Sequence, residues 1–302
     1  MTAPDLLMYG ATSKHNYDVI HVYLRHRADM LIRPFCPNPA AFFQLLRSTN
    51  SAVSGSIAYA YVTPAELGGW SPDNLDLFVR KQALPIVIHF LESFGYKSIK
   101  RTPAELAEAS LFGVLRGNFA FDVQQLRRGD SHINIIPCPY IPIAPIFESH
   151  STITMNFFTG FGFYSAYPLL TANQRSVINP NFWMLLERTA QTGIDNCITK
   201  YTQRGVEMQL TPAAWSKDSH MCTLSTRCPH TVRSLTDGHG LYIDLRVTNS
   251  STLRPRDGER TVFDDAYTVA WCLGGKPCNT RKRCPRPFVM VQYVDTQLFW
   301  DD

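Results

Sequence analysis

The stretch 54-SGSIAYAYVTPAELGGWSPDNLDLFV-79 contains the signals that decide the fold of this chain. A short apolar run ends at Gly55-Ser56, and residues 57 to 62 then have the composition of a short helix that Pro64 stops. Every second residue from 75 to 79 is aliphatic, which is the period of a strand. The order strand, turn, helix, strand predicts an α/β protein.

Helices and a hairpin are predicted on both sides of this stretch. Asn38-Pro39 is typical of a capped helix start, Gly205 ends a long helix that begins after Pro180, and Gly129 supplies a hairpin turn. The apolar positions between His21 and Arg33 keep helical spacing poorly, so the pattern gives no clear element there. The predicted helices cover residues 39–47, 84–95, 102–115 and 180–205, and the predicted hairpin covers residues 119–137.

These patterns predict the fold class α/β (α+β), with a mixed sheet flanked by helices. We divide the chain into a core at residues 20–170, a helical segment at residues 171–215 and a β-rich C-terminal extension at residues 216–302. Short β-prone runs separated by Gly, Pro and basic loops mark the extension. These runs lie at residues 241–247, 261–273 and 288–294.

The composition indicates a folded protein. The chain has 302 residues, of which 45% are hydrophobic and 18% charged, unlike a disordered sequence. The net charge of +4 is too small to require a polyanionic partner. No run approaches the roughly 20 apolar residues of a membrane helix, and no signal peptide is recognisable. We therefore expect no membrane partner, no secretion, a cytoplasmic or nuclear location, and eight reduced cysteines.

Gly55 and Ser56 have the chemistry of a phosphate-binding turn. Backbone amides and a hydroxyl at the start of a helix favour an anion, and the helix dipole adds to this preference. Asp76 lies on the following predicted strand, where residues two apart share a face. Nucleotidyl transfer requires such a turn together with carboxylates that hold Mg²⁺ over the phosphorus.

Three pieces of the stretch resemble a known family: 54-SGS-56, 70-WSP-72 and 74-NLDL-77. They are similar to the nucleotidyltransferase fold of DNA polymerase β-like enzymes, poly(A) polymerases and aminoglycoside nucleotidyltransferases. The resemblance is closer to a group of uncharacterised fungal proteins with this fold, in which Ser-Gly-Ser precedes a Trp-x-Pro turn and an Asp-Leu-Asp-Leu strand. It extends from about residue 24 through 147-FESHSTITMNFFTGFGFYSAYPLL-170, well over half of the chain, and implies a nucleotide site with Mg²⁺.

The chain departs from this family at two of the three metal-binding positions. The first family aspartate falls on Asn74, the second on Asp76, and the best candidate for the third falls on Asn134. Asp73 is adjacent, but in a regular strand a shift of one residue turns the side chain to the opposite face. One carboxylate with two amides should bind Mg²⁺ weakly. The resemblance therefore implies a degenerate nucleotidyltransferase. Such a pseudoenzyme would have little or no activity but would still bind a nucleoside triphosphate at the Gly-Ser turn.

Two other functions stay open. A divergent active enzyme would transfer a nucleoside monophosphate, with Asp76 and Asp73 as catalytic residues on Mg²⁺. An interaction protein would use the fold only as a scaffold for a protein partner. The basic loop 276-KPCNTRKRCPR-286 is compatible with nucleic-acid phosphates, although basic loops are commonly solvated surface.

The segment 220-HMCTLSTRCPH-230 is a second candidate metal site. In a hairpin, His220, Cys222, Cys228 and His230 would share a face and could meet a tetrahedral Zn²⁺. The segment lacks a Cys-x-x-Cys knuckle, and reduced cysteines are commonly buried for packing alone. The expectation is therefore buried thiols rather than zinc.

Overall fold

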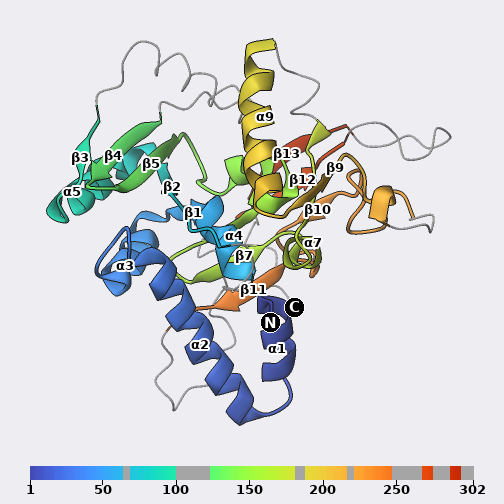
Figure 1. Cartoon of the computed structure of the whole chain (residues 1–302), viewed down its shortest axis with the longest axis horizontal. Coiled ribbons are helices and arrows are strands. Elements are labelled where there is room, and N and C mark those ends of the chain that lie inside the picture. Colours follow the sequence, from blue (N-terminus) through green and yellow to red (C-terminus); the bar gives the residue numbers. More distant parts are fainter. Residues whose placement is uncertain are drawn as a thin grey trace, which may run out of the picture.

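The computed structural model describes residues 1–63, 69–99, 123–180, 188–215, 221–246, 267–274 and 286–293. The α-helices are α1 (Ala3–Gly10), α2 (Lys14–Ile32), α3 (Pro39–Thr49), α4 (Ser56–Val62), α5 (Leu84–Ser93), α7 (Pro168–Ala172) and α9 (Arg188–Gln203), arranged as in Figure 1. The 3-10 helices are η1 (Lys81–Ala83), η2 (Ala144–Glu148), η3 (Thr152–Thr154) and η4 (Pro212–Trp215). Within the described ranges, every helix is too short or too polar to span a lipid bilayer.

The strands are short and occur along the whole chain. They are β1 (Ala52–Ser54), β2 (Asn74–Arg80), β3 (Lys97–Ser98), β4 (Gln124–Arg128), β5 (Ser131–Cys138), β6 (Asn156–Phe158), β7 (Gly162–Ser165), β8 (Arg175–Val177), β9 (Glu207–Gln209), β10 (Arg233–Ser234), β11 (Leu241–Asp244), β12 (Tyr267–Cys272) and β13 (Phe288–Tyr293).

Eight of the described strands form one mixed sheet, in the order β11-β7-β6-β1-β2-β5-β4-β3. Its neighbours pair antiparallel except for β2 and β5, which are parallel. Parallel strands need a long connection, and the connection between β2 and β5 contains η1, α5, β3 and β4. The predicted α/β class with a mixed sheet is confirmed.

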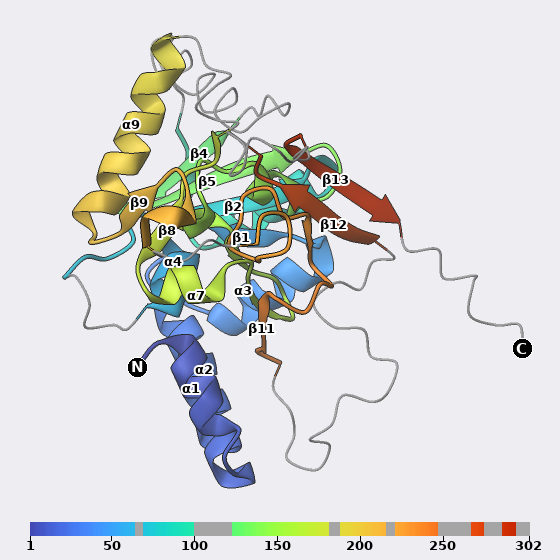
Figure 2. The same ribbon diagram turned by 90° about the vertical axis from the view of Figure 1, so that its right-hand side faces the viewer.

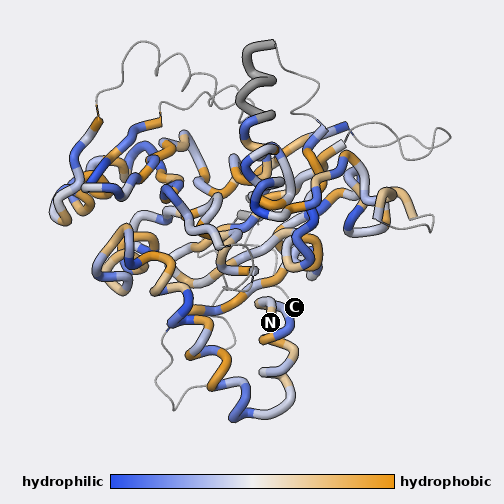
Figure 3. The backbone as a smooth tube through the Cα atoms, viewed as in Figure 1, coloured by the Kyte–Doolittle hydropathy of each residue, from blue (hydrophilic) through white to orange (hydrophobic). Residues whose placement is uncertain are grey.

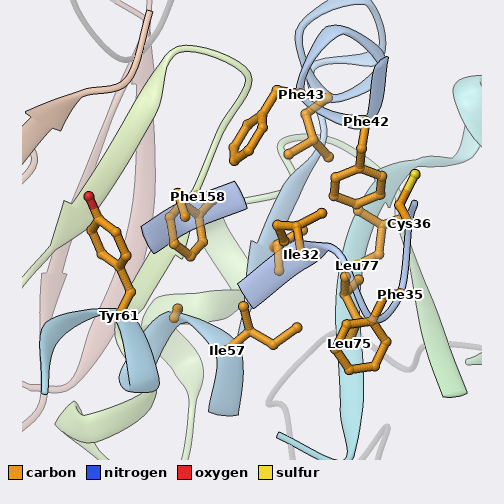
Figure 4. Packing of buried hydrophobic residues seen from close by; sticks show 14 of the residues in the cluster. Ile32, Phe35, Cys36, Phe42, Phe43, Ile57, Tyr61, Leu75, Leu77 and Phe158 are labelled. Atoms are coloured by element: carbon orange, nitrogen blue, oxygen red, sulfur yellow. The ribbon is translucent and has the colours of Figure 1, made fainter. Parts of the chain in front are cut away.

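The alternation along β2 separates two hydrophobic cores. Leu75 and Leu77 point to one face, where they belong to a cluster with residues of α2, α3, α4 and α5. Figure 4 shows Ile32 and Ile57 in this cluster, near the strand that carries Leu75 and Leu77. Phe78 belongs to a second cluster, which lies on the opposite face because successive strand residues point to opposite sides.

The second core joins the C-terminal strands to the main sheet. It contains Phe78 of β2, Phe147 of η2 and Trp271 of β12. The rings of Phe147 and Trp271 stack with their centroids 4.1 Å apart. β12 forms a three-stranded sheet with β10 and β13, and Figure 2 shows β12 and β13 beside the main sheet. The smaller sheet is therefore packed on the body of the protein.

Most of the predicted elements are confirmed where the structure describes them. α3 begins with the Asn38 side chain, which accepts a hydrogen bond from the Ala41 amide at 3.1 Å. β4 and β5 form the predicted hairpin around Gly129. The helix predicted at 102–115 lies outside the described residues. The beginning of the helix predicted from residue 180 also lies outside them, and α9 forms its later part.

The sequence pattern fails at α2, where it gave no clear element. α2 has 19 residues and buries Leu24, Ala28 and Ile32 on one side. Its opposite side exposes Val22 and Met30, which are also apolar, so the hydrophobic periodicity is blurred. Figure 3 shows hydrophilic and hydrophobic segments alternating along this helix.

The region from residue 216 onward contains the predicted strands β11, β12 and β13. β11 pairs with β7 and so lies at one edge of the main sheet. β12 and β13 pair with each other in the smaller sheet. This region therefore contributes a strand to the main sheet and side chains to its second core.

Candidate functional site

Polar side chains form a row across four neighbouring strands of the main sheet. Asp76 of β2 lies opposite Ser54 of β1 and opposite Asn134 of β5. Asn134 in turn lies opposite Gln125 of β4. Residues directly opposite on paired strands share a face, and so does Asn74, two residues before Asp76. The structure thus brings together Asn74, Asp76 and Asn134, the three positions that the sequence indicated.

Neutral amide donors hold the Asp76 carboxylate. The side-chain amides of Asn74 and Asn134 both donate to Asp76 Oδ1, at N–O distances of 2.8 and 2.9 Å. Gln125 Nε2 donates to Asn134 Oδ1 at 3.3 Å, which fixes the orientation of the Asn134 amide. An amide oxygen turned toward Asp76 would bring two acceptors into contact, so the NH₂ groups face the carboxylate. Protein dipoles therefore stabilise the charge of Asp76.

Gly55 lets the Asp76 carboxylate approach the turn before α4. Gly55 has φ 76° and ψ −142°, a backbone conformation that side chains with a Cβ rarely adopt. A Cβ at this position would lie 2.5 Å from Asp76 Oδ2. The two oxygens of Asp76 therefore have different surroundings, since Oδ1 faces the amides and Oδ2 faces the turn.

Arg204, just after the end of α9, links the Gly-Ser turn to the protein surface. Its Nη1 donates to Ser56 Oγ at 2.7 Å, and its Nη2 forms an ion pair with Asp73 Oδ2 at 3.2 Å. The guanidinium carbon lies 4.2 Å from the centroid of the Trp70 ring. The Arg204 side chain is only 9% exposed, whereas that of Asp73 is 74% exposed. Arg204 is therefore a largely covered cation at the pocket, and its counter-ion Asp73 is mostly exposed to solvent.

Aromatic rings pack around Arg204. Tyr59 stacks on Trp70 with the ring centroids 5.4 Å apart, and Tyr201 meets Tyr59 edge-on at 5.8 Å. Burial raises the pKa of Tyr59 to about 12. Burial also raises the pKa of Tyr201, an effect that a hydrogen bond with Ser56 opposes. Both phenols are therefore neutral near neutral pH and contribute packing rather than charge.

An open pocket of about 600 Å³ lies next to Arg204. This volume is within the range of small-ligand sites, about 300–1,000 Å³. Lys200, in the last turn of α9, and Arg204, just after the end of this helix, both line the pocket. The pocket is lined by Gly69, Trp70, Ser71, Asp73, Lys200, Gln203 and Arg204. It therefore has a cationic wall that contacts the Gly-Ser turn through Arg204.

Asp73 lies apart from the Asp76 cluster. It precedes β2, whose pairing with β5 is regular from Asn74 to Arg80. Its carboxylate pairs with Arg204, so the structure assigns Asp73 to the pocket wall. The sequence did not indicate Arg204, because 148 positions separate it from Ser56 and only the packing of α9 brings the two together.

Two further residues of the site were missed for different reasons. Trp70 belongs to the Trp-Ser-Pro turn that carries the family resemblance, and this is the signal that could have found it. Gln125 lies in the predicted hairpin, where its contact with Asn134 depends on the strand register.

The segment considered for zinc is only partly described. Cys222 and Cys228 are buried, with their Sγ atoms 4.0 Å apart, and His230 is also buried. His220 lies outside the described residues. Among the residues that the structure describes, no group of three or more His, Cys, Asp or Glu side chains is placed to hold a metal ion.

Two more titratable side chains lie at the end of η2 and in the loop after it. His150 Nδ1 is 2.9 Å from Ser151 Oγ, and its ring centroid is 5.6 Å from that of Tyr201. Glu148 Oε2 is buried and has no hydrogen-bond partner among the described residues. Burial raises the pKa of Glu148 to about 7, so this carboxyl changes its charge near neutral pH.

Comparison with known proteins assigns no family to the chain, since no family model, no curated protein and no solved structure matches it. The resemblance to nucleotidyltransferases therefore stays a prediction from the sequence.

Replacing Gly55 with Ala should destabilise the protein more than the same change at Gly129. Both glycines have positive φ, but a Cβ at Gly129 would meet nothing within 4 Å. We expect a loss of about 2–4 kcal/mol in the free energy of unfolding for Gly55→Ala and about 1 kcal/mol for Gly129→Ala, measured by urea denaturation. Equal losses would mean that the Asp76 carboxylate moves aside freely.

Replacing Glu148 with Gln should flatten the pH dependence of stability. The pKa of Glu148 is about 7 in the folded protein and 4.5 at its ordinary value. As pH rises between these values, the Glu148 carboxyl ionises in the unfolded chain before it does so in the folded protein, so the free energy of unfolding falls. Gln cannot ionise, so Glu148→Gln should raise Tm by several degrees at about pH 8 and change it little at about pH 4.5. Glu92→Gln, at an exposed position of α5, is the control. An equal Tm difference at both pH values would contradict the assignment.

Proposed function

We propose that this protein is a degenerate nucleotidyltransferase-like protein that binds a nucleotide without a divalent metal and does not transfer it. The single observation that carries the proposal is the saturation of Asp76 Oδ1 by the amides of Asn74 and Asn134. At a working metal centre, these lone pairs would face the cation. Here they accept hydrogen bonds from two neutral amide groups.

The charge at the site argues against two-metal catalysis. Mg²⁺ is held in such sites by carboxylates that offset its charge, and two ions require several of them. Asp76 is the only carboxylate among Asn74, Asp76 and Asn134. For Asn134 to offer its oxygen to a metal, its amide would have to rotate and lose the hydrogen bonds to both Asp76 and Gln125. Metal ligation by Asn134 would therefore cost two hydrogen bonds within the site.

The strand arrangement supports the family resemblance. The order β1, α4, β2 follows the resemblance at the Gly-Ser turn and the strand of Asp76. In the family that the sequence resembles, a later strand of the hairpin carries the third metal position, and in this chain that position falls on Asn134. That strand is β5, directly beside β2, with Asn134 opposite Asp76. These agreements favour a shared fold over a chance motif.

The pocket supports binding of a nucleotide. Lys200 and Arg204 supply positive charge to the pocket wall, and Arg204 also donates to the buried hydroxyl of Ser56, so Arg204 rather than Ser56 would contact a phosphate in the pocket. A phosphate group could replace Asp73 as the partner of Arg204, because the Asp73 carboxylate is mostly exposed and would be solvated by water after it leaves. Binding of this kind needs no metal ion.

Calorimetric titration with ATP, GTP, CTP and UTP, in EDTA or with Mg²⁺ or Mn²⁺, tests the proposal. We expect at least one nucleotide to bind with a Kd that changes by less than about threefold on adding metal. Lys200→Ala should weaken binding about tenfold, because a charge-assisted hydrogen bond contributes about 1.5 kcal/mol. Lys97→Ala, an exposed lysine on β3, is the matched control and should leave the Kd unchanged.

Two other outcomes would favour the other functions. Binding that requires metal and disappears in Asp76→Asn would indicate an active enzyme that uses Asp76 and Mg²⁺. If none of the nucleotides bound, the better explanation would be that the fold serves as a scaffold for a protein partner.

Restoring the missing carboxylates should create a divalent cation site. In the double variant Asn74→Asp with Asn134→Asp, three carboxylates would converge and repel one another, so Tm should fall by several degrees in EDTA. Mn²⁺ should reverse this fall, whereas it should leave the wild-type Tm unchanged. The double variant Asn74→Ala with Asn134→Ala is the control, since it loses the donors without adding charge and should not respond to Mn²⁺. If Mn²⁺ did not raise the Tm of the double variant Asn74→Asp with Asn134→Asp, the idea that these positions correspond to the metal ligands of nucleotidyltransferases would be contradicted.

A further inference from the structure

Two buried thiols meet in the loop that precedes β10. The Sγ atoms of Cys222 and Cys228 are 4.0 Å apart, and the two side chains are 6% and 1% exposed. A disulfide bond is about 2.05 Å long, so a closing movement of roughly 2 Å, within reach of side-chain rotation, would join them. The pair lies outside the candidate nucleotide site.

Backbone strain lies directly beside the pair. Thr223 has φ 69°, in the left-handed region, which is uncommon for any residue with a Cβ and an outlier for a β-branched one. The turn at this point is closed by hydrogen bonds from the amides of Leu224 and Ser225 to the carbonyl of Met221. Strain of this kind persists only where the surroundings enforce it, and it is concentrated at functional positions. Here it sets the path of the chain immediately after Cys222.

The loop is anchored on the core from several sides. Arg233, which is almost fully buried, donates to the carbonyl of Thr226 at 3.3 Å and pairs with Asp237 at 2.5 Å. The amide of Gly274 donates to the carbonyl of Pro229 at 2.8 Å. These contacts restrict the movement of Cys222 and Cys228 relative to each other, which raises the effective concentration of one thiol at the other.

We propose that Cys222 and Cys228 form a reversible dithiol–disulfide pair. The oxidant is a low-molecular-weight disulfide of the glutathione type. Cys222, the more exposed of the two, loses its proton to solvent, and its thiolate attacks one sulfur of this disulfide, which releases one glutathione thiolate and leaves a mixed disulfide on Cys222. Cys228 then loses its proton to solvent, and its thiolate attacks the Cys222 sulfur and releases the second glutathione thiolate. The two glutathione thiolates take up two protons from solvent. Two protein thiols are oxidised and one disulfide is reduced to two thiols.

Other cysteines in the described residues provide an internal contrast. Cys36 and Cys138 are buried, and each thiol contacts a backbone carbonyl, at 3.4 and 3.3 Å respectively. Cys272 also lies near the loop, because its thiol contacts the carbonyl of Pro229 at 3.4 Å. Cys272 is therefore the competing partner that the test must distinguish.

The test equilibrates the full-length protein with a series of glutathione buffers in EDTA, traps free thiols by alkylation and maps the disulfides by mass spectrometry. We expect a link between Cys222 and Cys228 that reduced glutathione reverses. Because the disulfide closes a short loop, oxidation should raise Tm by roughly 3–6 °C. The effective concentration of the pair should be at least about tenfold higher in the native protein than in urea, since the fold pre-aligns the thiols.

Three variants separate the pair from unspecific oxidation. Cys222→Ala should abolish both the link and the rise in Tm, whereas Cys36→Ala should retain both. Thr223→Gly keeps the two thiols but relieves the backbone constraint beside them. The concentration of oxidised glutathione that oxidises half of the pair should therefore rise severalfold. A link from Cys228 to Cys272, no link in the folded wild-type protein, or an effective concentration equal to that in urea would each overturn the proposal.

Discussion

The parallel pairing of β2 with β5 is the constraint on which the rest of the structure depends. One register places Asp76 beside Asn134 and Leu77 beside Ile135, so it sets the polar row and the helix-covered core together. A shift of one residue would exchange the faces, which would bury the carboxylate among aliphatic side chains and expose Leu77 to the site. Because an unpaired buried charge is very costly, this register is strongly specified.

The polar row shows how neutral amide groups accommodate a single carboxylate. Asp76 accepts two amide hydrogen bonds on one oxygen and faces the Gly55 turn with the other. Gln125 extends the chain of donors to a third strand by holding Asn134 in place. Gln125 orients Asn134, and Asn134 and Asn74 orient the Asp76 carboxylate, so these hydrogen bonds stabilise one another. This is the physical reason to favour metal-free binding over two-metal transfer.

Segments far along the chain complete both sides of the main sheet. Arg204 reaches Ser56 from the end of α9, and Trp271 of β12 packs on Phe147 beneath the sheet. Arg233 fastens the loop before β10 to the same region, through the carbonyls of Thr226 and Ala166. The candidate site is therefore held by a contact between the first and second halves of the chain, whereas the loop of the thiol pair is held by contacts within the second half.

By itself, the sequence determined the local elements near the site. Gly55 marked the break between β1 and α4, Asn38 marked the start of α3, and the aliphatic residues of β2 marked a strand with Asp76 on its other face. These features depend on backbone freedom, capping and alternation, which act over a few residues. The pattern failed at α2, because Val22 and Met30 are apolar but exposed. Only the tertiary structure decided that Asn74 and Asn134 donate to Asp76, that Asp73 belongs to Arg204, and that Cys222 meets Cys228. These contacts follow from strand register and from the packing of distant segments, and neither is encoded in the spacing of neighbouring residues.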